Sequence, residues 1–312
     1  MLSRCSHEVS GNPLCRPAKV FIWARLRIMM ICMNKKSVSY LMLYISSVLF
    51  ALNSVIVKIA ANTYSGLFIS SARFLFGIVF ISAALLLLGK GFRVNNKKAW
   101  ILRGISGAAS MVAYYLAIHL TSSGRATLLV NIYPLFVAIL GFLVFKEKIS
   151  KNTIVSLVFC TVGVLFVLND GSNYGILGDL VALGSGIAAG FAVHFVKKSR
   201  ETDNSLVIYL SPCLFGLGLL PFTSGEFTRV NPDGFALLFS VGLLSFLGQF
   251  LMAYGYREIS ASKGSIVFFL ETALAIVFST FIDERLSARF FAGLGLIVIG
   301  LAMNNYRFLQ DS

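Results

Sequence analysis

Ten long apolar runs, separated by short polar gaps, constrain this chain more than any other feature of its sequence. Crossing a hydrocarbon layer of about 30 Å takes about 20 helical residues, and most of the runs approach that length. Each run is continuously apolar rather than alternating, so they predict membrane-spanning helices and not barrel strands. We place the runs at 38–59, 67–88, 100–120, 126–145, 153–168, 175–196, 206–222, 235–256, 265–281 and 290–306.

The composition agrees with this pattern. The chain is 57% hydrophobic and only 13% charged, whereas a soluble domain carries about 25% charged residues. These values exclude an ordinary soluble globule, and they exclude a disordered chain because so many apolar side chains cannot remain solvated. The predicted fold class is therefore an all-α polytopic membrane protein with ten transmembrane helices.

No cofactor or metal is expected from the sequence. The five cysteines form neither a CxxC pair nor a disulfide framework, and the three histidines are scattered along the chain. The sequence also contains no GxxxxGK[ST] phosphate loop, so we expect no intrinsic ATP hydrolysis.

The basic residues predict the orientation in the membrane. The net charge is +14, but the basic side chains lie in gaps between apolar runs, where anionic lipid is the expected partner and nucleic acid is not. A cytosolic N-terminus places most of the Lys and Arg residues on the inner side, as the positive-inside rule requires. Both termini, including 307–312, are then cytosolic. The basic residues left on the outer side are Lys58, Arg73, Arg125, Arg229, Arg285 and Arg289.

Residues 1–36 differ from the rest of the chain. Their one apolar run is interrupted by Arg25 and Arg27, and no small-residue cleavage site follows it. We expect a basic cytosolic tail. Met33, which is followed by Asn34 and two lysines, is an alternative start of the chain.

The two halves of the chain are faintly similar to each other. FKEKIS at 145–150 follows the fourth run and IDERLS at 282–287 follows the ninth, so that Glu147 aligns with Glu284. Thirteen residues before these glutamates stand Pro134 and Glu271. Upstream, RFLFG at 73–77 matches PCLFG at 212–216. The pattern predicts two repeats of five helices, at 38–168 and 175–306.

An odd number of helices per repeat inverts the second repeat in the membrane. The segment ending at Ser150 is then cytosolic, whereas the segment ending at Ser287 lies outside. Inverted repeats are the construction of many secondary transporters, because two equivalent halves can rock around a site at the membrane midplane.

At these motifs the sequence resembles a known family. The ten runs, the ARF start of the second, the segment ATLLVNIYP at 126–134 and the two glutamate motifs resemble the drug/metabolite transporter superfamily, specifically proteins with two EamA domains. The resemblance covers about residues 38–306. It implies an inner-membrane carrier, commonly an exporter of amino acids, nucleotide-type metabolites or xenobiotics. Glu271 departs from the pattern, since the second repeat usually has proline there.

Glu271 is the strongest candidate for chemistry. An ionised carboxylate near the centre of a membrane helix costs a few kcal/mol or more, so it should face a wet cavity, pair with a cation or carry a proton. We interpret it as a proton-coupling or cation-recognising group. The alternative is a carboxyl that hydrogen-bonds within the helix packing.

Other polar groups inside the runs are candidates to bind substrate or to shape its cavity. Arg73 lies about two turns into the second run and could act as a gate or as a partner of Glu271, although a structural role remains open. Pro134 is expected to break its helix beside a cavity. The remaining candidates, for each of which interhelical hydrogen bonding is the alternative, are Asn53, Tyr114, Tyr115, Asn131 and Gln249.

The sequence therefore predicts a secondary transporter that moves a small organic metabolite by alternating access, in the direction of export and with protons as a candidate coupling ion. Membrane lipids surround it, and a homodimer is left open. An enzyme is not expected, because no pair of acids and no nucleophile with a base lies within the apolar runs. The remaining alternative is a membrane receptor or assembly scaffold that transports nothing.

Overall fold

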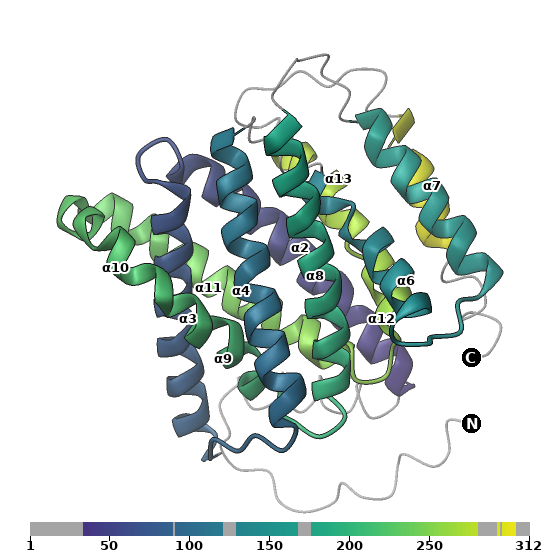
Figure 1. Cartoon of the computed structure of the whole chain (residues 1–312), viewed down its shortest axis with the longest axis horizontal. Helices are drawn as coiled ribbons and strands as arrows, with labels where there is room; N and C mark the ends of the chain where they lie inside the picture. Colours follow the sequence, from purple (N-terminus) through teal and green to yellow (C-terminus); the bar gives the residue numbers. More distant parts are fainter. Residues whose placement is uncertain are drawn as a thin grey trace, which may run out of the picture.

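The computed structural model describes residues 34–89, 91–120, 129–167, 176–279, 292–293 and 295–303. Within these ranges every regular element is a helix (Figure 1). The tail at 1–33, the IDERLS motif at 282–287 and the C-terminal residues 307–312 lie outside the described residues. The elements are α2 (Lys35–Ala60), α3 (Gly66–Leu87), α4 (Lys97–Leu120), α6 (Tyr133–Leu143), α7 (Lys151–Val167), α8 (Ile176–Ser199), α9 (Ser205–Gly216), η1 (Leu217–Leu219), α10 (Leu220–Thr223), η2 (Ser224–Arg229), α11 (Pro232–Gly255), α12 (Ala261–Ile266) and α13 (Phe269–Ser279).

The helices fall where the apolar runs predict them. Five helical segments within the described residues are long and apolar enough to cross a membrane, namely Lys35–Ala60, Gly66–Leu87, Ile176–Ser199, Ser205–Arg229 and Pro232–Gly255. The chain is a multi-pass membrane protein by this criterion. The full set of ten spans stays a prediction.

The surface of the bundle is apolar, which is the reverse of a soluble protein. Leu86 and Leu87 at the end of α3 are 82% and 87% exposed, and Phe142 on α6 is 64% exposed. By contrast, Arg73, Arg103 and several serines are buried among the helices. Polar groups inside and apolar groups outside suit a lipid environment, in which exposed leucines cost nothing.

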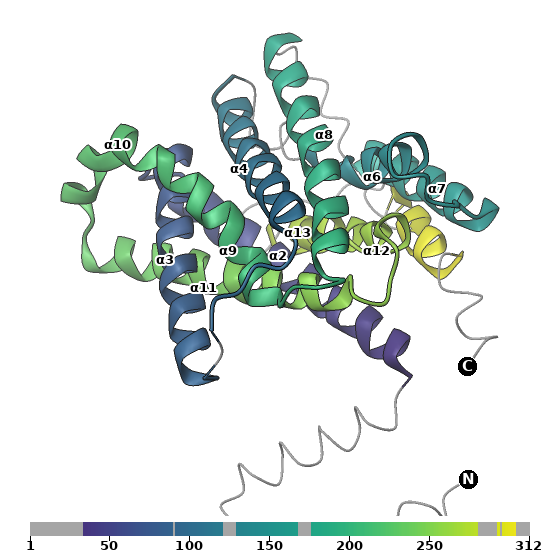
Figure 2. The ribbon, with the colours of Figure 1, turned by 60° about the horizontal axis from the view of Figure 1, so that its bottom comes forward.

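Helix contacts repeat when the two halves are exchanged. The packing of α2 on α11 is matched by that of α8 on α4, and α3 on α11 is matched by α9 on α4. In the same way α2 contacts α13 and α8 contacts α6. Figure 2 shows α4 and α8 side by side at the centre of the bundle. This correspondence is what two related five-helix halves produce.

Two glycines make the correspondence visible at single residues. A Cβ atom on Gly77 of α3 would lie 2.8 Å from the Cys213 sulfur of α9, and one on Gly216 of α9 would lie 2.2 Å from the ring of Phe74 on α3. In the alignment of RFLFG with PCLFG, Gly77 corresponds to Gly216 and Phe74 to Cys213. The two contacts are thus the same contact under exchange of the halves, as in a two-fold interface.

Both halves contain a helix break at aligned positions. Pro134 lies in the first turn of α6, where its missing N–H is tolerated, and Leu135 N–H bonds back to the Ile132 carbonyl at 2.8 Å. The predicted continuous run 265–281 is instead divided into α12 and α13. Hydrogen bonds of the i to i+3 type run through this division, ending with the Glu271 N–H on the Phe268 carbonyl at 3.1 Å.

The segments predicted to be cytosolic meet at one end of the bundle. Asn95 N–H donates to Asp203 Oδ1 at 2.7 Å, and Lys197 Nζ donates to the Arg257 carbonyl at 2.8 Å. At the other end the backbone N–H and the hydroxyl of Ser65 both donate to the Glu226 carboxylate. The loops therefore sort to the two ends as the charge pattern requires, while their orientation relative to the membrane is a proposal.

Candidate functional site

A cavity of about 160 Å³ lies between the two halves. Side chains from α2, α3 and α4 of the first half and from α8, α9, α11 and α13 of the second half line it. A cavity of about 150 Å³ already accommodates a benzene-sized molecule. All seven residues that the sequence indicates as substrate-binding or proton-coupling line this cavity: Asn53, Arg73, Tyr114, Tyr115, Asn131, Gln249 and Glu271.

Pro134 itself is not among the lining residues. It is buried, and its neighbours Asn131 and Tyr133, at the break before α6, face the cavity in its place. The role of Pro134 in shaping the cavity through this break stays a prediction.

Arg73 is buried in α3 beside Met111, Tyr115 and Tyr209. It is 5% exposed, and its Nη1 lies 3.3 Å from the Met111 sulfur, which is a weak acceptor. The phenol groups of Tyr115 and Tyr209 lie within electrostatic range of its guanidinium. Its Nε–H has no hydrogen-bond partner among the described residues. Part of the hydrogen-bonding capacity of Arg73 is thus free beside the cavity.

Glu271 and Arg73 line the same cavity and act on each other electrostatically. The two charged groups do not form an ion pair, and the Glu271 side chain makes no hydrogen bond to any residue in the described ranges. Glu271 is partly exposed, although it lies deep among helices, because it faces the cavity. The carboxylate and the guanidinium therefore face the same cavity without a direct ion pair.

Arg103 is a cavity residue that the sequence analysis missed. The charge pattern counted it with the basic residues of the inner side, but it is 6% exposed and lines the cavity. Its Nη2 donates to Gln249 Oε1 at 3.0 Å, whereas its Nε–H has no partner among the described residues. A signal was present in the sequence, since Gly107 follows one helical turn later. A Cβ atom there would lie 2.5 Å from Arg103 Nη1, so a larger side chain would displace the guanidinium from its present position.

The rest of the wall is mostly apolar and aromatic. Phe50, Phe74 and Met252 contribute apolar surface, while Tyr133 and Tyr209 add aromatic rings that the sequence analysis did not single out. Asn53 accepts a hydrogen bond of 3.4 Å from Ser245, which links α2 to α11. Such a wall with a few convergent polar groups is typical of small-molecule sites.

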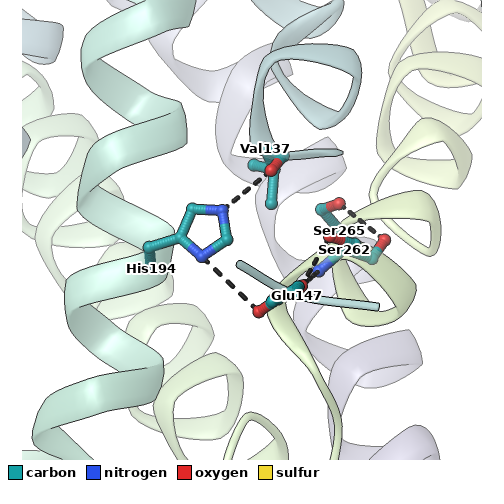
Figure 3. A network of polar contacts seen from close by, with 5 residues as sticks. All are labelled: Val137, Glu147, His194, Ser262 and Ser265. Carbon is teal, nitrogen blue, oxygen red and sulfur yellow. Dashed lines mark hydrogen bonds and ion pairs between the residues drawn. The ribbon is translucent and has the colours of Figure 1, made fainter. Parts of the chain in front are cut away.

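A second polar cluster, which we call the Glu147 clasp, lies away from the cavity and consists of Glu147, His194 and Ser262 (Figure 3). Ser262 Oγ and its backbone N–H donate to Glu147 Oε2 at 2.6 and 3.3 Å, and His194 Nδ1 lies 3.6 Å from Oε1. His194 Nε2 lies 2.8 Å from the Val137 carbonyl, and its ring stacks on Phe145. The clasp joins the segment after α6, which carries Glu147, to α8 and α12.

The fold and the cavity together define a helical multi-pass membrane protein with a central polar site between two related halves. The model of the EamA-like transporter family matches residues 37–169 and 176–306. The chain belongs to this family.

Relatives of this chain carry transporter names. An uncharacterized transporter of Archaeoglobus fulgidus is 24% identical over 258 residues, which cover 78% of this chain and 90% of the relative. The pseudopaline exporter CntI of Pseudomonas aeruginosa is 23% identical over 225 residues, which cover 71% of this chain and 79% of the exporter. The family and these relatives indicate a transporter of a small molecule rather than an enzyme.

The fold also occurs among solved structures. One crystal structure superimposes with a TM-score of 0.73 at 14% sequence identity, covering 87% of this chain and 98% of the other. At this identity the likeness concerns the fold alone.

Proposed function

We propose that this protein is a secondary active transporter that moves a small organic metabolite across the cell membrane by alternating access. The observation that carries the proposal is a cavity between two related halves that contains buried charged groups in a mostly apolar wall. Two such halves, inverted relative to each other as five plus five helices, can rock around a central site and open it to either side in turn.

The breaks at Pro134 and Glu271 support this mechanism. Both lie in aligned helices beside the cavity, at α6 and between α12 and α13. Broken helices leave backbone groups free to line a site and let helix segments move as separate bodies. The Glu147 clasp joins the segment that follows the first-half break helix α6 to the second-half break helix α12. We propose that the clasp holds these two segments together and opens when the halves rock.

Proton coupling through Glu271 is part of the proposal. The Glu271 carboxyl group faces the cavity beside Arg73 without a direct ion pair, and an ionised carboxylate at the centre of a membrane is costly. Glu271 can therefore exchange its proton when a charged solute enters or leaves the cavity. Both termini are proposed to be cytosolic, in an inner membrane, and the direction is proposed to be export, as the name of the pseudopaline exporter states for that relative.

Reconstitution tests the proposal. Purified protein in liposomes should exchange a radiolabelled solute across the membrane when a panel of metabolites is offered, with a pH gradient imposed or absent. Flux above protein-free liposomes supports a transporter. Specific binding of a solute without any flux would instead favour the alternative of a membrane receptor or scaffold.

A further inference from the structure

The cavity contains more positive than negative charge. Arg73 and Arg103 both line it, and each repels the other across a short range. Glu271 is the acidic residue among the lining side chains. With Glu271 ionised one positive charge is left over, and with Glu271 protonated two are left over. Buried charges are stable only when they are paired, so in either state the cavity is completed by an anion.

The hydrogen-bonding groups agree with the charge. The Nε–H groups of Arg73 and Arg103 are buried and lack partners within the described residues. A guanidinium presents its donors as a planar fork that matches the two oxygens of a carboxylate. The cavity is therefore lined by two guanidinium groups, which are of the kind that bind a planar anion, at the place where the charge excess lies.

The remaining wall sets the shape of the ligand. Phe50, Phe74, Val130 and Met252 face a space of about 160 Å³, which is near the volume that holds a benzene ring. The ligand is thus small, with an apolar or aromatic part opposite its charged group.

We propose that the cavity recognises a small organic monocarboxylate, an inference that rests on the proposed transport function and names its substrate class. The carboxylate lies between Arg73 and Arg103, and its apolar part lies against the aromatic wall. A monoanion balances the charge left over beside ionised Glu271. A zwitterion such as an amino acid leaves that charge unbalanced, and a cation increases it.

Binding to the detergent-solubilised full chain is the first test. The probes are phenylacetate, benzoate and isovalerate, with phenylacetamide as the neutral match, 2-phenylethylammonium as the cation and phenylalanine as the zwitterion. Charge-assisted hydrogen bonds are worth enough for a carboxylate to bind about tenfold or more tightly than its amide. If none of the three carboxylates binds more tightly than phenylacetamide, or if none of them binds at all, the inference is overturned.

Variants locate the site. Arg103→Gln should weaken phenylacetate binding about tenfold or more and leave phenylacetamide binding unchanged. Gly107→Ala keeps the charge but places a methyl group 2.5 Å from Arg103 Nη1, so it should weaken the same ligand even where Arg103→Gln folds poorly. Arg257→Gln removes an arginine whose side chain is 63% exposed, and it should not change the binding of phenylacetate or phenylacetamide. If Arg103→Gln and Gly107→Ala are both folded and bind phenylacetate like the wild type, the assignment is wrong.

Flux in proteoliposomes separates this inference from the transport function. Carboxylate binding without flux would remove the transport proposal and leave the ligand class standing. Flux of amines or neutral solutes without a preference for carboxylates would remove the carboxylate inference and leave the transport proposal standing.

Discussion

Gly77 of α3 lies against Cys213 of α9, with its Cβ position 2.8 Å from the sulfur. The aligned pair, Gly216 and Phe74, makes the same contact from the other half. These two contacts hold α3 and α9 close together beside the cavity, because Phe74 and Arg73 are sequence neighbours and Arg73 lines it. The interface between the halves therefore also positions a charged residue of the site.

Gly216 should not tolerate a side chain. In Gly216→Ala the new methyl group meets the Phe74 ring at 2.2 Å, and overpacking of this kind costs about 1–3 kcal/mol. We expect a lower thermal midpoint in detergent for this variant. Gly218→Ala, two residues further on, has open space around its Cβ position and serves as the control. Equal midpoints for the two variants would contradict the close packing of α3 on α9.

Gln249→Glu should weaken the binding of carboxylate ligands in the cavity. The new carboxylate would lie about where Gln249 Oε1 now accepts from Arg103 Nη2 at 3.0 Å, and so would neutralise the guanidinium. Carboxylate ligands should then bind about tenfold or more weakly. Gln249→Met, which removes the amide without adding charge, should have a smaller effect in the same titration. Identical affinities in the two variants would show that charge at this position does not matter.

Glu271→Gln should separate exchange from proton coupling. The amide keeps the size of the side chain but cannot take up or release a proton at any pH used. We expect an imposed pH gradient to accelerate flux in wild-type proteoliposomes and to have no effect in the variant, while solute exchange without a gradient persists. Glu258→Gln, at a residue with a 36% exposed side chain, is the control. Unchanged acceleration in Glu271→Gln would exclude Glu271 as the proton-coupling group.

The Glu147 clasp should contribute to stability through its hydrogen bonds. Glu147→Ala leaves the N–H and hydroxyl of Ser262 without their acceptor, and an unsatisfied buried donor costs about 1–3 kcal/mol. Glu147→Gln keeps an acceptor oxygen for Ser262 and loses only the charge near His194, so its thermal midpoint should lie between those of Glu147→Ala and the wild type. Glu201→Ala, at an exposed residue, should match the wild type. A thermal midpoint of Glu147→Ala equal to that of the wild type would mean that the clasp does not stabilise the protein.

Much of the helix arrangement could be predicted from the sequence because its signal is local. An uninterrupted apolar run marks α2 or α11 without any knowledge of its neighbours, and Pro134 marks the beginning of α6 because proline lacks the N–H that a continuous helix needs. The break between α12 and α13 has no such mark. It consists of hydrogen bonds of the i to i+3 type at 267–271, and no proline in this segment marks it in the sequence.

The site was only partly predictable, for a physical reason. Glu271 and Arg73 were found because an ionisable residue deep in an apolar run has to be accounted for. Arg103 lies close to Lys97 and Lys98 in the sequence, so it was grouped with the basic residues at the membrane surface. Its burial depends on the space above Gly107 and on Gln249 of another helix. Tyr209 was missed in the same way, since its ring reaches the cavity from α9 only after the helices pack.

Alternating access of the cavity is the central claim, and thiol labelling tests it most directly. Ser54 lines the cavity, so Ser54→Cys in a chain without its five native cysteines places one reactive group there. We predict that a membrane-impermeant thiol reagent labels this cysteine from either side of sealed, oriented vesicles, and that a bound ligand protects it. Labelling from one side alone, under every condition of ligand and pH, would contradict the account.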